Sequence, residues 1–160
     1  MNRKYMLIIW AILAFSCQDD EPEVEEEEPK EVLKPMAKAS IDGNVFEAAE
    51  FSISTAVSGE TYQITAMSAP QSISIFFYGL PEVKTYTLTD DIGTSGASIT
   101  WASDQLSSTT NHRVENGTIT VESFDDNLLK ASFSGTAAKV TDPDVTVEIS
   151  NGEVVARFPG

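Results

Sequence analysis

Apolar and polar side chains alternate along much of residues 38–160. The alternation runs through 51–57, 62–66, 72–78, 129–133 and 145–149, with shorter pieces at 99–101, 119–121 and 154–158. A period of two places one set of side chains in a core and the other in solvent, as in a half-buried antiparallel strand. No segment of comparable length has helical spacing, so the pattern predicts an all-β domain.

Residues that favour turns separate these runs at intervals of about ten residues, the spacing of sandwiches and barrels. Asn151-Gly152 lies between two alternating runs and predicts a type I′ hairpin, because both central residues of that turn need positive φ. Further turns are expected at Asp42-Gly43, Ser58-Gly59 and Asn116-Gly117, and at Pro70, Pro81 and Pro143. We therefore predict that residues 38–160 form a small antiparallel β-sandwich or a partly closed barrel. A body of about 120 residues buries enough surface to fold without disulfides.

Short strand and turn segments at 39–46, 85–88, 117–121, 133–137 and 149–152 resemble a family of small Bacteroidota lipoproteins known as a domain of unknown function. The resemblance covers most of the predicted β domain. It implies the same all-β fold. It brings no catalytic residue that could be carried over to this chain.

The first sixteen residues have the pattern of an export signal. Arg3 and Lys4 precede an unbroken apolar run at 5–15, which is shorter than the about 20 residues of a membrane-spanning helix. Ala14-Phe15-Ser16-Cys17 resembles a bacterial lipobox, although bulky Phe15 departs from its commonest form. The resemblance implies cleavage before Cys17, a diacylglyceryl group on its sulfur and a fatty acyl chain such as palmitate on its amine, which together anchor a protein stably. The alternatives are an ordinary secretory signal or an uncleaved anchor.

Residues 17–37 read as an acidic tether after the lipid. Gln18, Asp19, Asp20 and Glu21 resemble the short signal that sends Bacteroidota lipoproteins to the outer face of the outer membrane. The alternative is that they only begin the linker, which leaves the protein on the periplasmic face. The Glu- and Pro-rich remainder has few apolar groups and its like charges repel one another, so we expect it to be disordered and extended.

Composition excludes several function classes. The formal charge of -15, from 10 basic and 25 acidic residues, argues against a nucleic-acid partner, because phosphate binding needs clustered Lys and Arg. One Cys and one His cannot form the usual structural zinc set, and a single Cys cannot form an intrachain disulfide. We expect no metal and no cofactor.

Candidate catalytic groups are weak. His112 lies in a polar stretch at 107–113 and is expected to be an exposed loop residue. The carboxylate pairs Asp90-Asp91, Asp125-Asp126 and Asp142-Pro143-Asp144 could serve a hydrolase or a weak calcium site. They all fall where turns are expected, and Asp favours turns through bonds to nearby backbone. We therefore expect a non-enzymatic protein.

Two aromatic side chains give the strongest hint of a ligand. Phe76 and Tyr78 point to the opposite face from Ile73, Ile75 and Phe77, whereas Trp101 and Tyr62 are expected in the core. An exposed aromatic pair on a sheet suits stacking on sugars, unless another element covers it. We expect a lipid-anchored surface protein that presents its β domain to an unidentified protein or glycan partner. The alternatives are a carbohydrate-binding accessory lipoprotein of a glycan-uptake system and, more remotely, a surface hydrolase.

Overall fold

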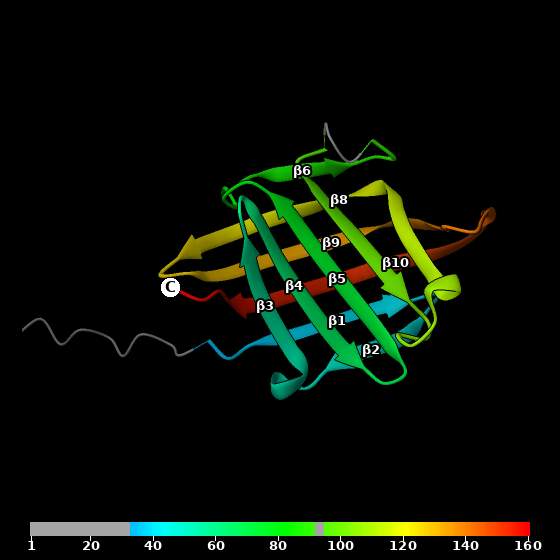
Figure 1. The fold of residues 1–160 in the computed structure, drawn as a ribbon, viewed down its shortest axis with the longest axis horizontal. Coiled ribbons are helices and arrows are strands. Elements are labelled where there is room, and N and C mark those ends of the chain that lie inside the picture. Colours follow the sequence, from blue (N-terminus) through cyan, green and yellow to red (C-terminus); the bar gives the residue numbers. More distant parts are fainter. Residues whose placement is uncertain (1–32, 92–94) are drawn as a thin grey trace, which may run out of the picture. The chain divides into compact units, whose positions relative to one another are not determined.

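The computed structural model describes residues 33–91 and 95–160, and within these ranges the chain is built almost entirely of strands (Figure 1). The strands are β1 (Met36–Ile41), β2 (Asn44–Ala48), β3 (Ile53–Ser58), β4 (Thr61–Ser68), β5 (Gln71–Tyr78), β6 (Thr85–Leu88), β7 (Ala97–Ala102), β8 (Asn111–Asp125), β9 (Leu128–Lys139) and β10 (Asp142–Arg157). Two short 3-10 helices, η1 (Glu50–Ser52) and η2 (Ser108–Thr110), lie between strands. No helix in this part of the chain is long and apolar enough to cross a membrane.

All strand pairs are antiparallel and belong to one sheet, in the order β2-β1-β10-β9-β8-β7-β5-β4-β3. The long strand β8 has two different neighbours on its free side. Residues 111–113 pair with β7, whereas residues 117–120 pair with β6. The sheet therefore turns back on itself at β8, and Figure 1 shows β3, β4 and β5 lying across β8, β9, β10 and β1.

The strands at each end of the order approach the opposite layer, with β3 near β10 and β2 near β4. Thr55 Oγ1 on β3 donates a hydrogen bond to the carbonyl oxygen of Arg157 at the end of β10, at 2.7 Å. The result is a nearly closed, barrel-shaped antiparallel sheet, which confirms the predicted all-β fold and favours the partly closed barrel.

The inward side chains of nearly all strands meet in one core. Its fully buried members are apolar and come from both layers of the folded sheet: Phe46, Ile64, Ile73, Ile75, Phe77, Leu88, Ile99, Val114, Ile119, Val121, Leu129 and Ile149. Trp101 is also buried, as predicted, and Tyr62 is half-buried at the core's edge, edge-on to Phe124 and Phe158. Burial of apolar area on this scale is the main favourable contribution to folding.

Three of the expected turns join paired strands: those at Asp42-Gly43 and Ser58-Gly59, and the one at Pro70, where Ala69-Pro70 links β4 to β5. Asp42 and Gly43 link β1 to β2 with φ of 47° and 80°, the positive values that a type I′ turn needs. Gly59, with φ of 59°, lies in the turn between β3 and β4. A further turn of the same kind, between β8 and β9, uses Asp126 and Asn127 with φ of 48° and 59°.

The turns expected at Pro143 and at the two Asn-Gly pairs are absent, because these residues lie inside β8 or β10, and those predictions are wrong. Asn151-Gly152 lies inside β10, where the register with β9 shifts between Ile149 and Gly152. Asn151 has φ of 50°, so it takes the left-handed conformation in a β-bulge and not in a hairpin. Asn116-Gly117 likewise lies inside β8, next to a register shift between Val114 and Asn116. The two runs expected as separate strands at 145–149 and 154–158 therefore belong largely to the single strand β10.

The predicted strand at 51–57 begins two residues late. Phe51 lies in η1 and is 92% exposed, and β3 starts at Ile53. The amide of Ser52 donates to the carbonyl of Ala49 at 2.8 Å, which closes a tight turn in place of a ladder bond. Alternation of residue types at 51–53 could not reveal this local turn.

Candidate functional site

The lipidation and export residues proposed from the sequence, Cys17, Gln18, Asp19, Asp20 and Glu21, lie outside the described residues. The structure therefore describes the surroundings of Phe76 and Tyr78, of His112 and the aspartate pairs proposed as catalytic or metal-binding groups, and of the outer faces of the sheet.

Phe76 and Tyr78 lie on the outer face of β5, as the alternation predicts. Tyr78 is 43% exposed and Phe76 is half-buried, whereas Ile73, Ile75 and Phe77 are buried in the core. The hydroxyl of Tyr78 forms a hydrogen bond of 2.9 Å with Ser98 Oγ on neighbouring β7. This bond holds the tyrosine ring down against the sheet while part of the ring remains open to solvent.

The surface around this pair is polar and uncharged. The outward positions of β3, β4, β5 and β7 hold no charged side chain, although the whole chain carries a formal charge of -15. They hold mainly hydroxyls and one amide: Ser54, Ser58, Thr61, Gln63, Thr65, Ser72, Ser74, Ser98 and Thr100. Gln63 lies directly opposite Phe76 and donates from Nε2 to Thr65 Oγ1 at 3.1 Å. We call this outer surface of β3, β4, β5 and β7 the aromatic face.

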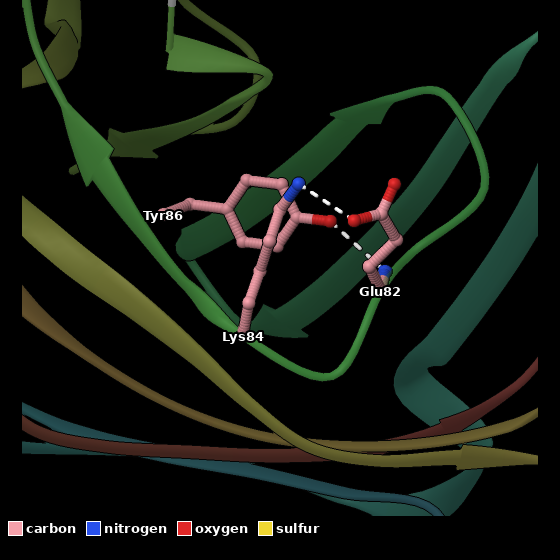
Figure 2. A network of polar contacts seen from close by, with 3 residues as sticks. All are labelled: Glu82, Lys84 and Tyr86. Carbon is pink, nitrogen blue, oxygen red and sulfur yellow. Dashed lines mark hydrogen bonds and ion pairs between the residues drawn. The ribbon is translucent and has the colours of Figure 1, made fainter.

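The loop at 79–84 borders the aromatic face at the Tyr78 end and is fixed by a small network (Figure 2). Lys84 Nζ contacts Glu82 Oε2 at 2.8 Å and lies 4.8 Å from the centre of the Tyr86 ring. The amide of Glu82 donates to Tyr86 Oη at 2.9 Å. The hydrogen bond to Glu82 raises the pKa of Lys84 above its ordinary 10.5, although partial loss of solvation acts in the opposite direction. Leu80 and Val83 of the same loop are exposed.

His112 is not an exposed loop residue, and that expectation is wrong. It lies in β8, is only 5% exposed and packs against the Trp101 ring at 4.9 Å between ring centres. Its Nδ1 lies 3.0 Å from the carbonyl oxygen of Thr110. A carbonyl can only accept, so Nδ1 carries the proton in this contact. The residues on either side of His112 in the sequence are polar, but His112 itself points inward from β8, opposite Trp101, and is therefore buried.

The carboxylate pairs proposed from the sequence lie apart. Asp90 and Asp91 follow β6, Asp125 and Asp126 lie at the β8–β9 turn, and Asp142 and Asp144 begin β10. In the described ranges, no three His, Cys, Asp or Glu side chains gather where they could hold a metal ion. None of these six aspartates lines the groove described next.

The structure reveals one feature that the sequence analysis missed, a groove of about 900 Å³ on the outside of the other layer. Thr118 and Thr120 of β8 and Ser132, Ser134 and Thr136 of β9 line it, and residues 146–153 of β10 form a further side. Asp42 completes the lining, and its Oδ1 accepts a hydrogen bond from the amide of Glu148 at 2.7 Å. The Thr-x-Thr and Ser-x-Ser spacing of these strands is visible in the sequence. Their assembly into one surface requires the strand order.

Comparison with known proteins identifies a family for the chain. A model of the family described as Domain of unknown function (DUF6252) matches residues 33–156. No significant match to the chain was found among curated proteins or among solved structures.

Proposed function

Because the chain belongs to the family DUF6252, whose description assigns no activity, we propose its role from its own sequence and geometry. The chain is a lipid-anchored protein of the outer membrane, facing the cell exterior, and it binds a partner without catalysing a reaction. Cys17 carries the lipid, the residues between Cys17 and the start of β1 at Met36 form the tether, and the β domain presents the binding surface.

The aromatic face is the observation that carries the binding role. An exposed ring beside hydroxyl and amide groups offers both a stacking surface and hydrogen-bond donors and acceptors. Its lack of charge separates it from the acidic remainder of the chain. A surface meant only to remain soluble in an acidic protein would not need to exclude Asp and Glu from four neighbouring strands.

The partner is unidentified in the proposal above, and a glycan is a more specific candidate that the position of Tyr78 favours. Sugars present apolar C–H faces that stack on aromatic rings and hydroxyls that exchange hydrogen bonds with side chains such as Gln63. The aromatic face supplies both kinds of group within neighbouring positions of β4 and β5.

A glycan array probed with the purified full chain tests this candidate. We expect binding to at least one immobilised glycan and a loss of about tenfold or more for the Phe76→Ala/Tyr78→Ala variant, because stacking contacts are removed. Phe51→Ala is the matched control, since it removes a ring that is exposed elsewhere. Binding that is unaffected by the double change would overturn the glycan candidate at this face.

The lipid anchor rests on the position of Cys17, which is the only cysteine of the chain. Growth with labelled palmitate should label the wild-type protein and place it in the membrane fraction. Cys17→Ala should lose the label and leave the membrane fraction, because two or more acyl chains are needed for stable attachment. Label that persists in this variant would mean that another residue is acylated.

Display on the cell exterior is tested separately. Protease added to intact cells should remove the domain of the wild-type protein. Asp19→Asn, Asp20→Asn and Glu21→Gln introduced together should protect the domain by retaining it inside. The control changes Glu26, Glu27 and Glu28 to Gln, which removes the same charge further along the tether. Equal protection by both triple variants would show that total charge, and not the position after Cys17, directs export.

A further inference from the structure

The outer faces of β6, β8 and β9 carry a regular array of hydroxyl groups. Register places Thr85, Thr120 and Ser132 in one row across the three strands, and Thr87, Thr118 and Ser134 in the next. Adjacent strands lie about 4.8 Å apart, and outward residues of one strand repeat about every 6.8 Å. The sheet therefore fixes a two-dimensional pattern of donors and acceptors without any loop.

Most of these hydroxyls have no partner within the part of the chain that the structure describes. Thr85 and Thr120 share a hydrogen bond of 3.0 Å. No hydrogen bond to protein is made there by the side chains of Thr87, Thr118, Ser132, Ser134 or Thr136. Each hydroxyl can donate one hydrogen bond and accept two. The array consequently has unused capacity that only water or a ligand can fill.

The array is hollowed where it meets β10. Two residues of β10, Ser150 and Asn151, occupy the space opposite Ser134, because the register passes from Ile149 opposite Gly135 to Gly152 opposite Phe133. These bulge residues line the groove together with Glu148 and Glu153. A β-bulge bends its strand locally. The groove of about 900 Å³ thus has a hydroxyl-bearing side from β8 and β9 and a second side from the bulged strand.

The charges around the groove restrict what it can hold. All charged side chains that line it are acidic, namely Asp42, Glu148 and Glu153. Glu153 is paired with Lys38, whose Nζ lies 3.0 Å from the Glu153 Oε2. An anionic polymer would meet repulsion, since phosphate or sulfate recognition uses Arg and Lys. An entirely apolar ligand would leave the hydroxyls and carboxylates of the lining without hydrogen-bond partners, and Phe133 and Ile149 in the lining are buried.

We propose that the groove on β8, β9 and β10 binds a neutral polysaccharide through its hydroxyl array. A chain of uncharged sugars matches the lining in the two properties that the structure defines, which are many hydrogen-bonding groups and no positive charge. The methyl groups of Thr118, Thr120 and Thr136 add small apolar contacts for sugar C–H groups. This site lies on the opposite layer from the aromatic face and does not depend on Phe76 or Tyr78.

Affinity electrophoresis of the purified full chain tests the proposal. The probes are laminarin, xylan and galactomannan as neutral polysaccharides and alginate as an anionic one, each cast into a native gel. We expect retardation by at least one neutral probe and none by alginate. Retardation by alginate alone, or by no probe, would overturn the proposal.

A pair of matched variants locates the site. The groove variant Thr118→Val/Ser134→Ala/Thr136→Val removes three hydroxyls, and we expect about tenfold weaker binding or more from the lost hydrogen bonds. The control variant Thr109→Val/Ser123→Ala/Thr141→Val removes three exposed hydroxyls that belong neither to the groove nor to the aromatic face, and it should bind within twofold of the wild type. Equal losses in the two variants, or no loss in the groove variant, would contradict the assignment.

Two further measurements distinguish a lost contact in the groove from misfolding of the variant and from sugar binding at the aromatic face. Thr118→Ser/Thr136→Ser retains the hydroxyls and should retain binding, and urea unfolding followed by tryptophan fluorescence should show that each variant is folded. If Phe76→Ala/Tyr78→Ala abolishes retardation and the groove variant does not, sugar binding belongs to the aromatic face and the groove proposal fails alone. The converse result supports the groove and removes the aromatic face as the glycan site.

Discussion

At the scale of single residues, close approaches between strands determine where the sheet accepts a side chain. Gly152 is buried opposite Phe133, and a Cβ atom there would overlap the Phe133 ring and lie 2.6 Å from the Phe133 carbonyl oxygen. Gly117 and Gly135 face each other across β8 and β9, and a Cβ on Gly117 would lie 2.7 Å from the Gly135 Cα. Glycine is required at such positions by space, not by φ alone.

Gly152→Ala should therefore destabilise the protein. We expect a decrease of about 1–3 kcal/mol in the free energy of unfolding, because the added methyl group must displace both a ring and a backbone oxygen. Urea unfolding followed by Trp101 fluorescence measures it. Gly160→Ala is the matched control, since a Cβ there would meet only Asn127 Nδ2 at an ordinary 3.6 Å. A stability equal to that of the control would mean that β10 shifts away from Phe133 without cost.

The Lys84 amine gives a prediction about proton binding. Glu82→Gln should lower the pKa of Lys84 toward 10.5, because the charged partner that raises it is removed. In the wild type the folded pKa is the higher one, so the stabilisation is complete below 10.5 and is lost as the pH rises through the folded value. An NMR titration of the Lys84 Cε and Nζ signals measures the shift. Glu122→Gln, on another strand, should leave the titration unchanged, and a Lys84 pKa that does not respond to Glu82→Gln would contradict the network.

At the scale of elements, alternation in the sequence identifies the strands better than turn motifs identify their ends. The run at 72–78 predicts which side chains of β5 face the core, and Ile73, Ile75 and Phe77 are buried there. Asn151-Gly152 misleads because a bulge and a type I′ turn both use an Asn with positive φ. The residue that distinguishes them is Phe133, which lies on another strand and is invisible to local reasoning.

The sequence predicts a candidate surface only as far as its residues lie on one strand. The outward positions of Phe76 and Tyr78 follow from the alternation within β5, so these two residues could be found from the sequence. The groove requires β8, β9 and β10 to be neighbours, and this order cannot be read from the sequence of any one strand. His112 was misjudged likewise, because the Trp101 ring that covers it comes from β7.

The turn between β8 and β9 gives a prediction for an element. Asn127 has φ of 59°, and its carbonyl oxygen accepts a hydrogen bond of 2.8 Å from the amide of Phe158. Asn127→Val should lower the free energy of unfolding by about 1–2 kcal/mol, because a β-branched residue is strained in the left-handed region. Asn127→Gly should remain within about 0.5 kcal/mol of the wild type, since glycine accepts this conformation. Chemical denaturation of both variants measures the difference, and equal stabilities would show that the turn changes its conformation freely.

At the scale of the whole molecule, the acidic charge that is absent from the aromatic face is not balanced by basic residues elsewhere. From Lys38 to the end there are sixteen acidic and six basic residues. In the part of the chain that the structure describes, the ion pairs Lys38–Glu153, Lys84–Glu82, Arg113–Glu115 and Lys130–Glu122 involve side chains that are about one third or more exposed. Exposed pairs of this kind contribute little to stability. Mutual repulsion of the remaining carboxylates therefore opposes the compact state.

Added salt should consequently stabilise the protein. Raising NaCl from about 10 mM to 500 mM shortens the Debye length from about 30 Å to a few ångströms, which screens repulsion between separated carboxylates. We expect Tm to rise by several degrees, measured by circular dichroism.

The variant Glu60→Lys/Asp144→Lys removes part of the repulsion at exposed positions, so its Tm should be higher than that of the wild type at low salt and should depend less on salt. Glu60→Gln/Asp144→Asn, with a smaller charge change, should lie between the two. A Tm that falls as salt is added would mean that the ion pairs of Lys38, Lys84, Arg113 and Lys130 outweigh the repulsion among the unpaired carboxylates.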